Sequence, residues 1–206
     1  MVGGDEREVA AVTPHPSQRA AWVRDMHSLL ERKASVGLKA LDLFCGAGGL
    51  SLGFWASGFD VEGIDHSPDA VSTYASNFSH ATCADVDADS ELPSADVVVA
   101  GPPCQPWSRA GKRLGERDER DGFMTTLRAV ERVQPAAVVI ENVPDLARAS
   151  GRSHLDDFKG RLRALGFAVA EHELNSADYG VPQNRRRIFI TGIRDDRPLD
   201  RPAPGG

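Results

Sequence analysis

The residue in this chain best suited to nucleophilic chemistry is a cysteine beside two prolines. Cys104 lies in the segment GPPCQPWS, which directly follows the apolar run Val97–Ala100. A lone cysteine is more often a small buried hydrophobic residue, and that alternative stays open. The prolines hold the backbone rigid, however, and a nearby cation would raise the fraction of thiolate, the nucleophilic form. The segment therefore predicts a thiol presented at the end of a strand.

A carboxylate follows a second apolar run. Glu141 begins the tetrapeptide ENVP and ends the run 137–140. A glutamate at this point is either a plain strand terminator or a group that donates a proton in catalysis. The pattern is compatible with both, and we keep Glu141 as a candidate acid.

Three consecutive arginines stand near the end of the chain, in the segment QNRRRIF. In a strand, Arg185 and Arg187 point to one side and Arg186 points to the other. Two guanidinium groups on one side could hold a carbonyl oxygen or a phosphate, although they could also form a solvated face.

A glycine-rich turn, DLFCGAGGL, follows the first predicted strand. A full dinucleotide fingerprint has the form G-x-G-x-x-G, but Ser51 stands where the third glycine would be. Asp65 ends the next apolar run, where a carboxylate suits the hydroxyls of a ribose. The combination predicts a site for an adenosine-containing cofactor, with a simple turn and a solvated acid as the alternatives.

Apolar runs alternate with helix-like stretches, which predicts an α/β fold with a mostly parallel sheet covered by helices on both faces. The predicted strands are 40–44, 59–64, 96–100 and 136–141, and the predicted helices are 50–57, 67–78 and 122–134. Segments 167–174 and 187–193, with no clear helix between them, predict a closing antiparallel strand pair. Ligands bind at the carboxyl ends of parallel strands, which is where the motifs lie.

The rest of the chain is divided by composition. The composition predicts a tail over residues 1–16 and an N-terminal helical region over 17–36. It predicts a catalytic domain over 37–194 and a linker-like C-terminal tail over 195–206. The helix is expected from Ser17 to about Ala34, because one helical face carries the apolar residues Trp22, Met26, Leu29 and Leu30.

Composition excludes several classes of protein. The longest apolar run, 136–140, is far shorter than the roughly 20 residues of a membrane span, and the N-terminus has no apolar signal core. Cys45, Cys83 and Cys104 form no C-x-x-C pair, so we expect no disulfide scaffold and no metal, and a reducing cytoplasm as the setting. The net charge of −6 argues against a general nucleic-acid binder.

Taken together and in this order, DLFCGAGG, GPPCQPWS, ENV and QNRRRIF resemble the C5-cytosine DNA methyltransferase family over about residues 38–193. The resemblance implies a Rossmann-like S-adenosylmethionine-dependent methyltransferase fold for the catalytic domain. It also implies methyl transfer from S-adenosylmethionine to cytosine C5, double-stranded DNA as the substrate and a restriction-modification role.

The resemblance implies a role for each matched residue. Cys104 would add to C6 of a flipped-out cytosine, and Glu141 would engage N3 and the exocyclic amine. Arg185 and Arg187 match the paired arginines of the family, with Arg187 the closer partner of the cytosine O2 and of Glu141. The expected cofactor-binding residues are Phe44, Cys45, Gly46, Gly48, Gly49, Leu50, Asp65, His66, Asp85, Val86 and Pro103.

DNA contacts are expected from a segment that closes over the flipped base, residues 105–122, with simple solvation as the alternative. The implied contact residues are Gln105, Ser108, Arg109, Lys112 and Arg113.

The chain departs from the family pattern at its end. The family continues with a target-recognition domain and a final segment that supplies a helix beside the first strand, whereas this chain stops at Gly206. We therefore expect a split enzyme with a second polypeptide, or a truncated product. The helix at 17–34 is hypothesised to take the place of the missing helix, with a tail helix packed on the sheet as the alternative.

Other functions remain open at this point. One alternative is an inactive cofactor-binding remnant or interaction module, and another is an RNA cytosine-5 methyltransferase acting on tRNA. A dehydrogenase is the weakest alternative, because the third fingerprint glycine is absent.

Overall fold

The computed structural model describes residues 28, 30–86, 91–103, 122–148, 151–195 and 197–204. The chain divides into two units, Met1–Glu31 and Arg32–Gly206, and the sheet belongs to the second. The predicted domain limits at 37 and 194 stay predictions.

The helix predicted for 17–34 lies mostly outside the described residues, and its predicted end is wrong. Ser28 is helical, but residues 32–36 form no helix. The backbone N–H groups of Lys33 and Val36 instead donate to the carbonyls of Ala56 and Gly58, at 2.9 and 3.0 Å. These bonds to a distant part of the chain replace the local bonds that a helix would need.

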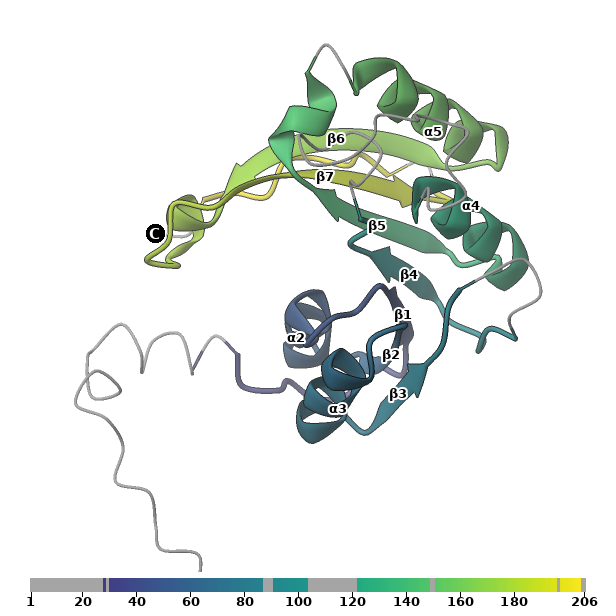
Figure 1. Cartoon of the computed structure of the whole chain (residues 1–206). Coiled ribbons are helices and arrows are strands. Elements are labelled where there is room, and N and C mark those ends of the chain that lie inside the picture. The colour runs from purple at the N-terminus through teal and green to yellow at the C-terminus, as the bar shows by residue number, and fades with distance from the viewer. Residues whose placement is uncertain are drawn as a thin grey trace, which may run out of the picture. The chain divides into compact units, whose positions relative to one another are not determined.

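A seven-stranded sheet forms the centre of the second unit, with the order β3-β2-β1-β4-β5-β7-β6 (Figure 1). The strands are β1 (Lys39–Leu43), β2 (Asp60–Asp65), β3 (His80–Cys83), β4 (Val97–Ala100), β5 (Ala137–Asn142), β6 (Ala168–Asn175) and β7 (Arg186–Ile193). Strands β1 to β5 pair in parallel, while β7 runs antiparallel to both β5 and β6. The predicted parallel sheet and its closing antiparallel pair are confirmed.

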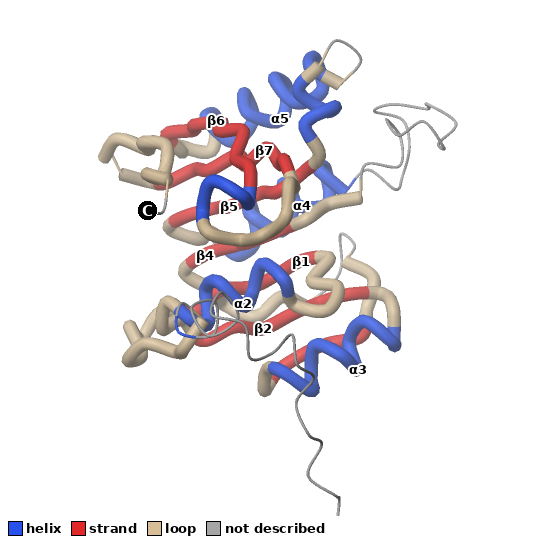
Figure 2. The backbone as a smooth tube through the Cα atoms, turned by 90° about the vertical axis from the view of Figure 1, so that its left-hand side faces the viewer, coloured by secondary structure: helices blue, strands red, loops and turns tan. Residues whose placement is uncertain are grey.

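Helices α2 (Gly49–Ala56) and α3 (Pro68–Asn77) cover one face of the sheet, and helices α4 (Gly122–Val133) and α5 (Arg152–Ala164) cover the other (Figures 1 and 2). The chain also has short 3-10 helices, η3 (Pro144–Ala147) and η4 (Ser176–Tyr179). Alternating strand residues face opposite layers, as the pleat requires. On β1, Ala40 packs in the cluster under α2 and α3, and Leu41 packs in the cluster under α4 and α5.

Local chemistry explains where α3 begins. The Ser67 hydroxyl accepts a bond from the N–H of Ala70, and Pro68 occupies the first turn, where its missing N–H costs nothing.

The strands of the central sheet are rich in valine, and Val98 and Val99 of β4 are fully buried. Burial on both faces is why β4 has no polar alternation.

One strand and one α-helix were not predicted. Strand β3 is short and mostly exposed, so it carries little apolar pattern, and its pairing with β2 defines it. Helix α5 places Leu155, Phe158 and Leu162 on its buried face, at helical spacing. Its many charged residues obscured that spacing, and one of them, Lys159, is itself buried.

The predicted linker-like tail follows the sheet edge. The carbonyl of Leu199 lies 3.0 Å from His172 Nε2 on β6, and the Tyr179 hydroxyl donates to the Pro202 carbonyl at 3.0 Å. The segment has no regular secondary structure, but these bonds hold it beside β6 and η4.

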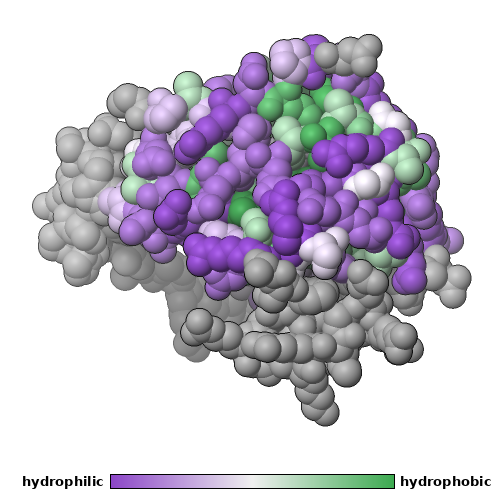
Figure 3. Space-filling view, turned by 90° about the horizontal axis from the view of Figure 1, so that it is seen from above, coloured by the Kyte–Doolittle hydropathy of each residue, from purple (hydrophilic) through white to green (hydrophobic). Residues whose placement is uncertain are grey.

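Seen from above, the described surface is mostly hydrophilic and carries one apolar patch, toward the upper right of the view (Figure 3). Within the described ranges, no helix has the length and apolar character needed to cross a membrane.

Candidate active site

The glycine loop leaves β1 through residues with positive φ angles. Phe44 has a φ of 58°, Gly46 of 53° and Gly48 of 92°. A side chain on Gly48 would meet the ring of Phe78 at 2.3 Å, so only glycine fits there. At Gly46 and Gly49, an added Cβ would meet no atom within 4 Å. The loop is thus fixed in shape and leaves open space against its backbone.

Asp65, at the carboxyl end of β2, holds this loop from one side. Its two oxygens accept the backbone N–H groups of Gly46 and Ser67, both at 2.9 Å. Each carboxylate oxygen has a second lone pair, so the group keeps acceptor capacity for a ligand hydroxyl. The neighbouring His66 ring is exposed and lies 3.5 Å from Asp65 Oδ1.

A buried polar chain holds the loop from below, and the sequence did not predict it. The Ser51 hydroxyl donates to Asp42 Oδ2 at 2.7 Å and lies 2.8 Å from the Tyr74 hydroxyl. Asp42 precedes the loop and Ser51 follows it, so their hydrogen bond joins the two ends of the loop. Burial raises the pKa of Asp42 to about 7, against the opposing effect of the Ser51 hydrogen bonds. The other oxygen, Oδ1, has no hydrogen-bond partner.

Cys45 is a structural thiol. It is buried, and desolvation raises its pKa to about 12, with the nearby carboxylates of Asp42 and Asp65 adding to the shift. A thiol with so high a pKa is inert as a nucleophile at neutral pH. Cys45 Sγ would also lie 2.7 Å from a Cβ at Gly63, which explains the glycine inside β2.

The remaining predicted cofactor residues lie on neighbouring strand ends. Asp85 is exposed after β3, and Val86 packs against the main core. The N–H of Ala84 donates to the Asp65 carbonyl at 3.0 Å, which joins the ends of β2 and β3. Leu50, in the first turn of α2, packs against the core cluster of that face.

The Gly101–Pro103 segment leaves β4 at the same edge. Pro102 is buried, and Pro103 is exposed. A Cβ on Gly122, the first residue of α4, would lie 2.8 Å from Pro102 Cβ and from Pro103 Cδ, so this glycine permits the close packing. Cys104, Gln105, Ser108, Arg109, Lys112 and Arg113 lie outside the described residues.

Glu141 is held by two arginines across the strand pair β5–β7. Its Oε1 lies 2.8 Å from Arg187 Nε and 3.3 Å from an Nη atom of Arg185. Arg186 points the other way and pairs with Glu173 at 2.7 Å. The predicted division of the three arginines is confirmed, and Arg187 is the closer partner. The Glu141 side chain is 18% exposed, so it faces the site and keeps some access to solvent.

Asn142, the next residue after Glu141 on β5, bonds to the proline segment, a contact that the sequence did not predict. Its side-chain nitrogen donates to the Pro102 carbonyl at 3.0 Å, and its oxygen accepts the N–H of Val143 at 2.8 Å. A Cβ on Gly101 would lie 3.9 Å from both Glu141 Oε2 and Leu50 Cδ1. The glycine loop, the proline segment and Glu141 therefore share one edge of the sheet.

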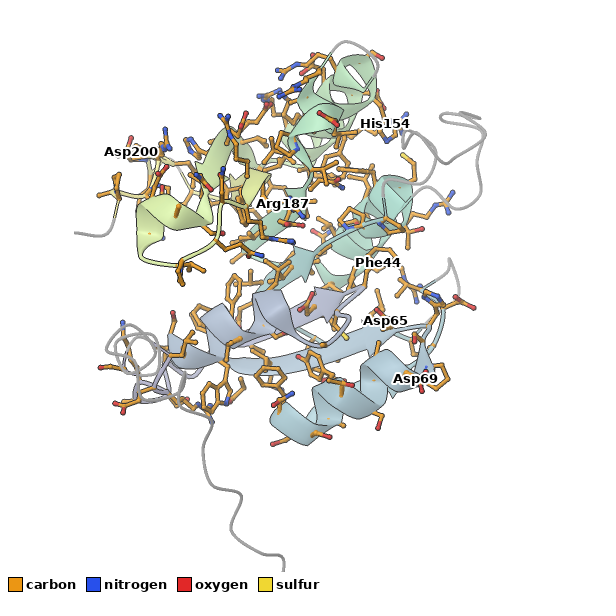
Figure 4. The ribbon with its side chains drawn as sticks, turned by 60° about the vertical axis from the view of Figure 1, so that its left-hand side comes forward. Phe44, Asp65, Asp69, His154, Arg187 and Asp200 are labelled. Atoms are coloured by element: carbon orange, nitrogen blue, oxygen red, sulfur yellow. The ribbon has the colours of Figure 1, made fainter. Side chains whose placement is uncertain are left out.

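Figure 4 labels Phe44, Asp65 and Arg187, which come from the ends of β1 and β2 and from the start of β7. A glycine loop with an acid after the second strand suits an adenosine-containing cofactor, and the open space at Gly46 and Gly49 fits that interpretation. Among the described residues, no group of His, Cys, Asp or Glu side chains is arranged to hold a metal ion.

This architecture is the Rossmann-like fold of S-adenosylmethionine-dependent methyltransferases. Two solved structures share it: a protein described as a DNA modification methyltransferase from an E. coli prophage, and DNMT2 of Spodoptera frugiperda. The first is 28% identical with a TM-score of 0.65, covering 76% of this chain and 47% of the other. The second is 26% identical with a TM-score of 0.62, covering 78% and 51%.

Residues 38–204 match the model of the C-5 cytosine-specific DNA methylase family, and the chain belongs to that family. The Type II methyltransferase M.AgeI of Thalassovita gelatinovora is 38% identical over 180 residues, which are 81% of this chain and 42% of that protein. M.AplI of Arthrospira platensis is 36% identical over 182 residues, which are 86% and 52%. The chain thus spans about half the length of these relatives.

Proposed function

We propose that the chain is the catalytic part of a DNA (cytosine-5)-methyltransferase that uses S-adenosylmethionine. The observation that carries this proposal is the grip of Arg187 and Arg185 on Glu141, beside the proline segment that leads to Cys104. A carboxylate and cations held together next to a candidate nucleophile suit covalent activation of a polar ring.

S-adenosylmethionine supplies an electrophilic methyl group when it is bound. The glycine loop offers open backbone at Gly46 and Gly49 for the methionine part, and Asp65 offers free lone pairs for the ribose. The full set of residues proposed to hold the cofactor is Phe44, Cys45, Gly46, Gly48, Gly49, Leu50, Asp65, His66, Asp85, Val86 and Pro103.

Cys104 is proposed to act as the nucleophile. Its thiolate adds to C6 of cytosine, which makes C5 nucleophilic enough to accept the methyl group. A base then removes the C5 proton, and the C6–S bond breaks to restore the ring and the thiolate. A thiolate cannot reach a stacked base, so the cytosine must be flipped out of the duplex.

Glu141 is proposed to hold the ring during the addition. Its carboxyl group bonds to N3 and the exocyclic amine, which relieves the negative charge that the thiolate brings to the ring. Arg187, on the same carboxylate, fixes its orientation and reaches the cytosine O2 with its remaining N–H groups. Arg185 supports both, from a longer distance.

Double-stranded DNA is the proposed substrate, and residues 105–122 are proposed to close over it through Gln105, Ser108, Arg109, Lys112 and Arg113. The relatives are about twice as long as this chain, so we propose that the part that recognises the target lies outside these 206 residues, either on the same polypeptide or on a second one. A restriction-modification role in a reducing cytoplasm is proposed for the whole.

Transfer of labelled methyl from S-adenosylmethionine to unmethylated mixed-sequence DNA tests this function, with Cys104→Ala as the control. Label on cytosine C5 that disappears in the variant supports it. Cofactor binding without label, even after the missing half is added, supports a remnant that only binds the cofactor. Label on tRNA but not on DNA supports the RNA enzyme.

A further inference from the structure

Asp42 is a buried acid that the proposed mechanism does not use. It is 2% exposed, and it lies on β1 directly before the glycine loop. Its bond to Ser51, directly after the loop, places the carboxyl group beneath the backbone that is proposed to hold the cofactor. Any charge bound in the loop therefore lies close to this group.

The surroundings of Asp42 contain no positive charge among the described residues. Ser51 of α2 and Tyr74 of α3 contribute hydroxyl groups, and the groups that raise its pKa or share its environment are Asp65 and Cys45. Gly63, opposite Asp42 on β2, has no side chain. One carboxyl oxygen has no partner at all.

A buried carboxylate without a cation is unstable, so the group must take up a proton or be neutralised by a charge that arrives with a ligand. S-adenosylmethionine carries a sulfonium cation, and S-adenosylhomocysteine, the product of methyl transfer, does not. The two ligands thus differ in the charge that Asp42 would experience.

We propose that Asp42 senses the charge of the bound cofactor, holding a proton in the free chain and releasing it to solvent when the sulfonium ligand binds. The thioether product gives no such release. Asp42 is then a specificity-determining residue that favours the methyl donor over the product as pH rises. This inference rests on the proposed use of S-adenosylmethionine.

The burial and the raised pKa of Asp42, about 7, place the proton uptake in the physiological range. If the sulfonium lowers this pKa by about one unit, binding at pH 7 releases roughly 0.4 of a proton, and the affinity ratio of donor to product rises about fivefold between pH 6 and pH 8.

Isothermal titration calorimetry in buffers of different ionisation enthalpy measures the protons released. We expect release with S-adenosylmethionine and little with S-adenosylhomocysteine. Asp42→Asn should abolish the difference between the ligands. Tyr74→Phe is the matched control, since it removes a hydroxyl from the same chain but leaves the Asp42–Ser51 bond, and it should keep the proton release.

The outcomes distinguish failure of the proposed cofactor from failure of the proposed role of Asp42. No binding of either ligand would overturn the proposed cofactor and this inference with it. Binding with equal proton release for both ligands, or with none for either, would overturn the role of Asp42 and leave the cofactor assignment intact. The wild-type titrations decide this even if Asp42→Asn does not fold.

Discussion

Gly122 offers the sharpest test of how the proline segment is positioned. An added Cβ would lie 2.8 Å from Pro102 Cβ and from Pro103 Cδ, and 3.3 Å from Pro102 Cα. Proline rings cannot rotate away, so Gly122→Ala must move either α4 or the segment that leads to Cys104. Overpacking of this kind costs about 1–3 kcal/mol.

The helix itself would gain from the change, because alanine is better than glycine in a helix by about 0.5–1 kcal/mol. The net loss of stability expected for Gly122→Ala is therefore about 0–2.5 kcal/mol. For a chain of this length, that lowers the melting temperature by up to about 10 °C.

Gly160→Ala is the matched control, because it is the same substitution inside α5, where an added Cβ meets nothing within 4 Å. The control should raise stability by about 0.5–1 kcal/mol. Urea unfolding followed by circular dichroism measures both variants. If Gly122→Ala proves as stable as Gly160→Ala, the close packing of Gly122 on the prolines is refuted.

Three further predictions concern the site. Glu141→Gln should slow methyl transfer in single turnover by about 10²–10⁴-fold while the melting temperature stays near that of the wild type; a rate near wild type would contradict the role of Glu141. Arg187→Lys should cost roughly tenfold more activity than Arg185→Lys, because Arg187 makes the shorter contact with Glu141; equal losses in the same assay would argue against this ranking. The third prediction is a pH dependence of stability. The folded pKa of Asp42, about 7, lies well above its unfolded value of 3.8, so the wild type should lose about 3 kcal/mol of unfolding free energy between pH 4 and 7, relative to Asp42→Asn. Urea titrations across that range should show the two pH profiles converging toward acid, and parallel profiles would contradict the raised pKa.

The sequence alone determined which residues stand at strand ends. Apolar runs identify the strands of a parallel sheet, and the carboxyl ends of such strands meet at one edge, so the glycine loop, Asp65, Pro103 and Glu141 could be grouped without coordinates. The alternation of side chains along a strand predicted that Arg185 and Arg187 would face one way. Both patterns depend only on residues that are near one another in the chain, so they can be recognised in the sequence.

Tertiary structure decided the contacts between distant segments. Asp42, Ser51 and Tyr74 form one chain only because α2 and α3 pack on the same face of β1. Asn142 reaches Pro102 because β4 and β5 are neighbours in the sheet. No periodicity encodes such pairs, since each depends on which elements become neighbours.

Strand β3 and helix α5 also depend on contacts with other elements of the fold. Strand β3 has little apolar pattern of its own, and its backbone bonds to β2 make it a strand. In α5, Lys159 is buried because Glu171 on β6 lies 2.6 Å from its amine. From the sequence pattern, such a lysine is expected to be exposed. Its burial is possible because an acidic partner on another element offsets the cost of removing the charge from water.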